Sequence, residues 1–136
     1  MSRSERAARI VARARAMIGV PFRLHGRGAE GVDCVGLAAA ALGRAQGSGS
    51  YGLRSGDVAQ AARMLAQAGL RPVAAAQAGA GDLALVRPGP LHLHIMMATG
   101  AGFVHAHAGL GRVVETPGAS PWPVIGWWRD GAGEED

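Results

Sequence analysis

Apolar side chains recur at helical spacing near the start of the chain. They are Ile10, Val11, Ala14, Met17 and Ile18. Residues three and four positions apart share one face of a helix, so this spacing predicts an amphipathic helix with one buried side. Ser2 and Glu5, three residues apart, predict a capping box at its beginning. Gly19, followed by Pro21, ends the pattern.

Two further helices are expected in the first half of the chain. The second begins at Cys34, because Asp33 is a favourable N-cap residue, and its alanine-rich run extends to about Ala45. The third covers 55–68, where apolar positions again recur at helical spacing. Gly69 provides a C-terminal stop for this third helix.

Beyond Pro72 the pattern changes to short apolar runs separated by glycine and proline. We expect these runs to form five strands, over 83–86, 91–98, 103–108, 112–116 and 124–128. Helices gathered in the first half and strands in the second are typical of an α+β domain, in which antiparallel strands pack against the helices. The pattern does not favour an alternating parallel sheet.

The length of 136 residues suits one domain with a single core and is too short for two. We therefore predict one domain over 1–130, followed by a short acidic tail over 131–136.

Two connections stand out between the helices. The glycine-containing segment 22–32 has no clear period and is expected to be a loop, and the Gly-Ser segment 47–50 is expected to be flexible.

Charge and hydropathy exclude several classes of protein. The formal charge is +4, and the arginines that carry it are spread from Arg3 to Arg129 without a concentrated stripe or stacking aromatics, so we predict no nucleic-acid partner. No apolar run approaches the roughly 20 residues of a membrane-spanning helix. The beginning of the chain also lacks the apolar stretch of a secretory signal, so we expect synthesis in the cytoplasm and delivery by other means.

Cys34 is the single cysteine, which excludes an internal disulfide. At the start of a helix, unpaired backbone N–H groups and the helix dipole stabilise a thiolate, and the same N–H groups can hold an oxyanion. As a nucleophile, Cys34 is expected to have a pKa below the ~8.5 of a free thiol. The alternative is a buried structural cysteine.

Four of the five histidines lie in two neighbouring predicted strands. The pairs are His92 with His94, and His105 with His107. Side chains alternate between the two faces of a strand, so each pair shares a face. The positions expected on the opposite, core face of the first strand are Leu91, Leu93, Ile95 and Met97. A hairpin turn at 99–102 would bring both pairs to the same face, which makes that face a candidate site.

Two kinds of chemistry fit a cysteine with two pairs of histidines. Cysteine-dependent acyl transfer needs a base near the sulfur and a group that orients this base, and one histidine from each strand supplies both. A zinc site is the alternative, with imidazoles from both strands and Cys34 as a further ligand. Zinc binding leaves the position of the only cysteine at a helix start unexplained, so we favour the thiol chemistry with no bound metal.

The segments around Cys34 are similar to motifs of a known family. Residues 31–37, Gly-Val-Asp-Cys-Val-Gly-Leu, resemble a D-C-x-G-L nucleophile motif, and 20–26 resemble the loop that leads to it. These motifs belong to the NlpC/P60 family of papain-like cell-wall peptidases. The ordered resemblance continues through most of the remaining chain, in segments 81–85, 92–95, 103–106, 109–115 and 124–129, and it is strongest to the short phage-type branch of the family.

The resemblance implies roles for individual residues. Cys34 matches the nucleophile, His92 the general base, and His105 the third residue that orients the base. His94 stands where the family pattern has glycine, and His107 where the phage-type branch often has an aromatic residue. Both are departures that crowd or extend the site, and either is an alternative base.

The loop before Cys34 departs from the family as well. Phe22 stands where the family usually has a tyrosine, whose hydroxyl is thought to assist the reaction, and phenylalanine has no such donor. His25, three residues later, is a candidate replacement donor, although an ordinary loop histidine is the simpler interpretation. Asp33 is expected to cap the helix more than to take part in the chemistry.

The resemblance also implies a fold, a substrate and a context. The implied fold is papain-like, with N-terminal helices packed on an antiparallel sheet of about five strands. The implied activity is hydrolysis of a peptide bond in bacterial peptidoglycan stem peptides, without a cofactor.

For the phage-type branch, the resemblance implies local opening of the cell wall by the tail of a phage or gene-transfer-agent particle. The protein would then be part of the particle, bound to a tail-tip or hub protein, and would act at the target cell wall. The alternative is a structural tail-tip module that keeps the fold with weak or lost catalysis, as Phe22 and His94 suggest.

Overall fold

The computed structural model describes residues 1–44, 53 and 56–131. Its helices are α1 (Arg3–Ala16), α2 (Cys34–Leu42) and α4 (Val58–Gln67), with a single 3-10 turn, η1 (Ala75–Gln77). The predicted flexible segment 47–50 and the tail beyond Gly131 lie outside the described residues. No helix in the described ranges combines the length and the apolar character needed to span a membrane.

The caps of the first two helices agree with the sequence. The Ser2 side chain accepts a hydrogen bond from the Glu5 amide and the Glu5 side chain returns one to Ser2, which confirms the capping box of α1. Asp33 caps α2, as expected. The predicted end of α2 near Ala45 is wrong, because Gly43 takes a left-handed conformation (φ 69°) directly after Leu42.

The third helix begins later than predicted. The Asp57 side chain accepts a hydrogen bond from the Gln60 amide, so α4 begins after Asp57; residue 55, the predicted start, lies outside the described residues. At the other end, Gly69 has φ 88° and follows the C-cap, which confirms the predicted stop. Local turn chemistry therefore sets both ends of α4.

The second half of the chain forms a six-stranded antiparallel sheet. Its strands are β3 (Leu70–Val73), β4 (Leu83–Gly89), β5 (His92–Ala98), β6 (Gly102–His107), β7 (Arg112–Pro117) and β8 (Val124–Asp130), in the order β3-β8-β4-β5-β6-β7. The last five confirm the five predicted strands. The sequence analysis missed β3, which contains Pro72 and pairs with β8 at the edge of the sheet, where proline is tolerated.

A second, small sheet lies in the segment that was expected to be a loop. β1 (Arg27–Gly28) and β2 (Gly31–Val32) pair antiparallel immediately before α2. The expectation of a loop throughout 22–32 is therefore wrong for these two short strands. Their tight hairpin positions Asp33 and Cys34 at the start of α2.

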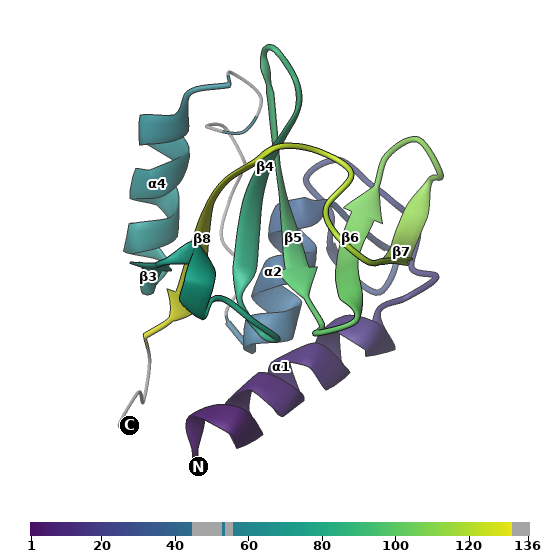
Figure 1. The fold of residues 1–136 in the computed structure, drawn as a ribbon. Coiled ribbons are helices and arrows are strands. Elements are labelled where there is room, and N and C mark those ends of the chain that lie inside the picture. Colours follow the sequence, from purple (N-terminus) through teal and green to yellow (C-terminus); the bar gives the residue numbers. More distant parts are fainter. Residues whose placement is uncertain (45–52, 54–55, 132–136) are drawn as a thin grey trace.

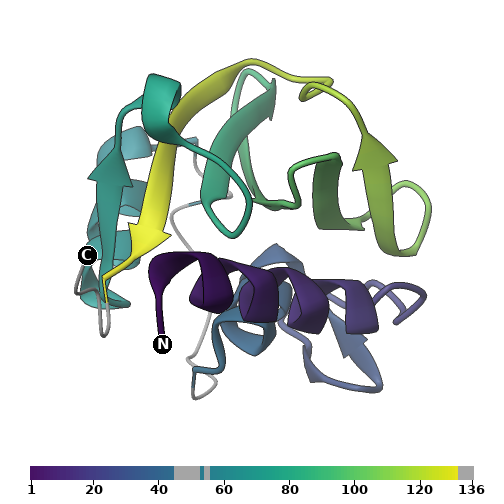
Figure 2. The ribbon, with the colours of Figure 1, turned by 60° about the horizontal axis from the view of Figure 1, so that its bottom comes forward.

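The sheet is covered differently on its two faces (Figures 1 and 2). α1 and α2 cover one face and bury the main core, which includes Leu37, Leu93, Ile95, Val104 and Ala106. On the opposite face, the connection between β7 and β8 crosses the sheet and buries a smaller cluster of Ala84, Val86, Met96, Ala98 and Phe103 beneath Trp122 and Trp127. Each strand of the centre is thus buried on both faces.

The alternation predicted for β5 is correct except at its beginning. Leu93, Ile95 and Met97 lie in the main core. The prediction for Leu91 is wrong, because this residue precedes the strand and is 75% exposed in the turn between β4 and β5. The predicted turn at 99–102 is confirmed, since it joins β5 to the antiparallel strand β6.

β5 and β6 are paired only near this turn. Their two registered pairs are Met97 with Val104 and Ala98 with Phe103, although both strands lie within the described part of the chain. Further from the turn the two strands diverge, while β5 stays paired with β4 and β6 with β7. The backbones of β5 and β6 are therefore unpaired beside the start of α2.

Candidate functional site

Two glycines allow the start of α2 to approach the hairpin that precedes it. A Cβ on Gly36 would lie 2.3 Å from the Gly26 carbonyl oxygen, and a Cβ on Gly26 would lie 2.3 Å from the Gly31 carbonyl oxygen. Side chains at these positions would therefore force the segments apart. The glycine in the Asp-Cys-Val-Gly-Leu motif thus has a physical role, which is to seat Cys34 close to the hairpin.

The Asp33 carboxylate holds the same region together. One oxygen accepts hydrogen bonds from the Gly36 amide (2.9 Å) and the Arg27 guanidinium (2.8 Å), and the other accepts one from the His25 amide (3.0 Å). The prediction that Asp33 is a cap is confirmed. His25 has φ 62°, which is uncommon for a residue with a side chain, and its amide bond to Asp33 helps to stabilise that conformation.

The Cys34 sulfur lies among backbone N–H groups at the start of α2. Hydrogen bonds from the amides of Ile95, Cys34 and Val35 favour the thiolate. Burial acts in the opposite direction and is the largest effect, and the neighbouring Asp33 charge adds to it, so the pKa of the thiol is raised to about 12. The expected lowering of this pKa is wrong for the thiol in this structure, because desolvation outweighs the helix start.

Three side chains form a hydrogen-bonded chain on the face of the sheet opposite α2. His94 Nε2 lies 3.0 Å from His105 Nδ1, and His105 Nε2 lies 2.9 Å from Thr116 Oγ1. Trp122 contacts both rings edge-on, with centroids 5.7 Å from each. We call His94, His105 and His107, together with Trp122, the histidine cluster.

The environment of the histidine cluster keeps the imidazoles of His94 and His105 neutral. Burial lowers the pKa of His94 to about 3, helped by the nearby charges of His105, His92 and His107. Burial also lowers the pKa of His105 to about 4, with a contribution from His107. The nearest groups are other imidazoles, so protonation of one disfavours protonation of the next.

The four histidines of the two strands therefore differ in their surroundings. His94 and His105 meet, whereas His92 is exposed at the first position of β5. His107 is partly buried, and its Nδ1 accepts a hydrogen bond from the Leu110 amide (3.0 Å). The structure thus brings the third predicted residue, His105, to His94 and not to His92.

The thiol and the histidine cluster lie on opposite faces of the sheet. Cys34 packs against the main core, whereas His94 and His105 lie on the face covered by Trp122. The sulfur is nevertheless next to the His94–Ile95 peptide, where β5 and β6 have diverged. Within the described residues, no hydrogen bond joins this sulfur to an imidazole.

The remaining predicted positions lie in the loop before α2. Phe22 is partly buried against the main core, where its ring acts as an apolar contact, and its amide donates to the Gly111 carbonyl. The His25 residue is exposed on this loop. Its suggested role as a replacement hydrogen-bond donor stays a prediction.

The zinc alternative depends on how the candidate donor atoms are arranged. In the described ranges, no group of three or more His, Cys, Asp or Glu side chains is arranged to hold a metal ion. His105 uses both ring nitrogens in hydrogen bonds to His94 and Thr116. Both of its ring nitrogens are therefore engaged within the protein.

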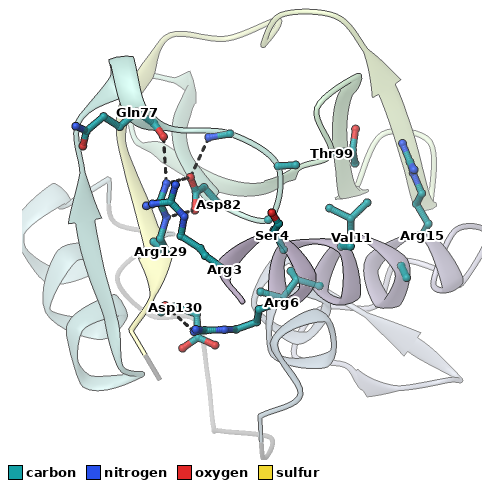
Figure 3. A pocket seen from close by; sticks show the side chains of 17 residues that line it. Arg3, Ser4, Arg6, Val11, Arg15, Gln77, Asp82, Thr99, Arg129 and Asp130 are labelled. Carbon is teal, nitrogen blue, oxygen red and sulfur yellow. Dashed lines mark hydrogen bonds and ion pairs between the residues drawn. The ribbon is translucent and has the colours of Figure 1, made fainter. Parts of the chain in front are cut away.

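A cavity of about 720 Å³ lies elsewhere, between α1 and the ends of β4 and β8 (Figure 3). We call it the arginine groove, since Arg3, Arg6, Arg15 and Arg129 line it. Arg129 forms two hydrogen bonds of 2.9 Å with the buried Asp82 carboxylate, and Arg15 pairs with Glu115 at 3.0 Å. Arg129 and Arg15 are thus held by acidic partners of the protein itself.

Two members of the site were missed by the sequence analysis. Thr116 was recognised only as the end of a strand, and Trp122 was given no role in the site. Strand alternation could have predicted that Thr116 lies on the same face as His105. Phe103 pairs with Thr116 and His105 pairs with Val114, and all four lie on one face. No local pattern predicts the contact of Trp122, which depends on how the connection between β7 and β8 crosses the sheet.

Comparisons with known proteins identify the fold. No family model matches the chain, and no curated protein matches it. Among solved structures, it is similar to NlpC1 from Trichomonas vaginalis, with a TM-score of 0.68 and 22% identity over 91% of this chain and 44% of that one. This chain therefore spans less than half the length of that protein.

Two further structures belong to proteins described as peptidoglycan hydrolases. For RipB from Mycobacterium tuberculosis, the TM-score is 0.64 with 22% identity, over 96% of this chain and 68% of that one. For the NlpC/P60 domain of SagA, the TM-score is 0.56 with 28% identity, over 82% of this chain and 88% of that one. The chain thus has the NlpC/P60 fold, and the expected α+β architecture is confirmed.

Proposed function

We propose that this protein is a cysteine endopeptidase that hydrolyses peptide bonds in the stem peptides of bacterial peptidoglycan. The observation that carries the proposal is the position of Cys34, whose sulfur lies at a helix start beside three backbone N–H groups and next to the peptide that follows His94. Similar structures of peptidoglycan hydrolases support the choice of substrate.

The proposed reaction begins with a neutral thiol. The Cys34 sulfur attacks the carbonyl carbon while its proton passes to an imidazole nitrogen, and backbone N–H groups stabilise the oxyanion. The imidazolium then gives this proton to the leaving amine, and the C–N bond breaks to form a thioester. Water attacks the thioester, loses a proton to the imidazole, and releases the carboxylic acid and the thiol.

The backbone position of His94 supports it as the base in this scheme, with His105 holding it. The sulfur lies beside the His94–Ile95 peptide. His92 lies two residues before His94, which is roughly 7 Å further along the strand. His94 is also the histidine bonded to His105. The family pattern favours His92 instead, so the two single variants decide between them.

The deciding experiment is digestion of purified peptidoglycan with the wild type and with Cys34→Ala, followed by mass spectrometry of the fragments. New amine termini that require Cys34 would support the proposal and identify the bond. Comparison of His92→Ala with His94→Ala then identifies the base. Equal digests from the wild type and Cys34→Ala, with the wild type shown to be folded, would contradict the proposal.

A catalytically weak or inactive tail-tip module is the second candidate. It is favoured by one observation, the burial that raises the pKa of Cys34 to about 12 and keeps the nucleophile protonated. This candidate predicts no cleavage under any condition, but retained binding to a particle protein. Activity that appears only after assembly with such a partner would favour the peptidase.

We further propose that the protein works from the tail of a phage-like or gene-transfer-agent particle, bound to a tail-tip or hub protein, at the wall of the target cell. The support is the resemblance of 109–115 and 124–129 to the phage-type branch, and these segments form parts of β7 and β8. Mass spectrometry of purified particles tests this role. Absence of the protein from intact, infective particles would contradict it.

A further inference from the structure

The hydrogen-bonded chain in the histidine cluster ends on a hydroxyl group. His105 is completely buried, and its two ring nitrogens contact His94 Nε2 at 3.0 Å and Thr116 Oγ1 at 2.9 Å. Buried polar atoms are costly without a partner, so each of these contacts needs one proton between the two atoms. The position of one proton therefore determines the position of the next.

Two arrangements of protons satisfy this chain. In the first, His105 Nε2–H donates to Thr116, His105 Nδ1 accepts from His94 Nε2–H, and His94 Nδ1 carries a lone pair. In the second, Thr116 donates to His105 Nε2, His105 Nδ1–H donates to His94 Nε2, and His94 Nδ1 already carries a proton. Only the first arrangement leaves His94 able to accept a proton from a thiol.

The surroundings limit how these rings can move or find other partners. Trp122 lies edge-on to both His94 and His105, with interplanar angles of 89° and 87°. His107 also contacts this ring, with centroids 5.4 Å apart, and itself packs against Trp122 at 6.3 Å. A hydroxyl group that can accept a hydrogen bond is thus the partner that His105 Nε2–H requires.

We propose that Thr116 is a positioning residue, which accepts a hydrogen bond from His105 Nε2–H and thereby keeps the Nδ1 atom of His94 free to act as a base. This inference rests on the proposed function for its catalytic meaning. Its structural part, the tautomer of two imidazoles, can be measured in the protein without substrate.

The test compares Thr116→Val with Thr116→Ser. Valine has nearly the shape of threonine but no acceptor, so His105 is expected to change to the Nδ1–H tautomer and to donate to His94. Serine keeps the hydroxyl group and the wild-type tautomers. Heteronuclear NMR of the histidine ring nitrogens reports both changes directly, and thermal unfolding shows whether each variant is folded.

The kinetic readout separates positioning from substrate binding. We expect Thr116→Val to lower kcat about 10–100-fold with little change in KM, as is typical when a group that orients a catalytic ligand is lost. Thr116→Ser should restore most of the rate. Unchanged histidine tautomers in a folded Thr116→Val variant would overturn the inference, and so would an unchanged kcat.

The two proposals fail in different ways. A wild type that is folded, shows the expected tautomers and cleaves no peptidoglycan contradicts the proposed function, whereas the NMR result would still support the role of Thr116 in fixing the imidazoles. If the wild type is active and its histidine tautomers are unchanged in Thr116→Val, only the inference about Thr116 is contradicted.

Discussion

The arginine groove and the histidine cluster are both rich in titratable groups, but they combine them in opposite ways. In the groove, opposite charges meet, as in the buried pair of Arg129 and Asp82. In the cluster, groups of the same kind meet, and the neighbouring imidazoles disfavour a proton on His94 and on His105. Pairing of opposite charges stabilises the charged forms, whereas crowding of imidazoles does not.

This contrast separates a structural region from a candidate reactive one. The carboxylate of Asp82 joins the end of β8 to the turn before β4, because it also accepts a hydrogen bond from the Gly79 amide. Its hydrogen bonds therefore fix the fold. The histidine cluster offers no comparable stabilisation by charge, and a requirement for proton transfer gives a reason for four histidines to lie on two adjacent strands.

The largest expected effect is on catalysis. His94→Ala should lower the rate of peptidoglycan cleavage about 10²–10⁴-fold, because the proposed base is lost. His92→Ala is the matched control on the same strand and should retain most of the activity. Fragment release followed by mass spectrometry measures both. A greater loss in His92→Ala would show that the exposed histidine is the base.

Substitution in the arginine groove should affect stability instead. Asp82→Ala removes the carboxylate paired with the nearly buried Arg129, and loss of one partner of a buried pair costs about 3–5 kcal/mol of unfolding free energy. Chemical denaturation measures this loss. Replacing Arg129 by methionine in the same variant should restore part of it. Loss of kcat in folded Asp82→Ala would contradict the proposed separation between the two regions.

The thiol should react slowly with alkylating agents in the free protein. The raised pKa of Cys34 means that its thiolate is scarce at neutral pH, so alkylation by iodoacetamide should be at least tenfold slower than for a free thiol with a pKa of about 8.5. Measuring the rate as pH increases should show it still rising above pH ~9. Rapid alkylation at pH ~6 would indicate a resting thiolate–imidazolium pair.

Stability should fall in mild acid because of the histidine cluster. The pKa values of His94 and His105 are lowered in the folded protein, so below pH ~6.5 the unfolded chain binds more protons than the folded one. The loss is about 1.4 kcal/mol per pH unit for each imidazole that stays neutral, and it continues towards pH ~4. Denaturation of the wild type and of His105→Gln across this range measures it, and equal slopes would contradict the assignment.

Much of the fold could be predicted from local patterns. Helical spacing and caps predict α1 and the start of α2, because these signals lie within a few residues of one another. Strand alternation predicts the faces of Leu93, Ile95 and Met97. β3 escaped prediction because Pro72 argues against a strand until its place at the sheet edge is known.

The site was less accessible to prediction. The pattern brings the two histidine pairs to one face, but it does not say which ring meets which, since this depends on how β5 and β6 diverge. The effect of burial on the pKa of Cys34 could not be predicted from the sequence either. A helix start is visible in the sequence, whereas the desolvation that outweighs it depends on elements far apart in the chain.

The groups that surround the Cys34 sulfur are amides of the main chain, from Ile95, Cys34 and Val35. Every amino acid except proline supplies such an amide, so mutations that exchange side chains at these positions leave the donors in place. An environment of this kind can persist through long divergence. It is therefore consistent that the fold is shared with proteins of 20–28% identity while no family model matches the chain.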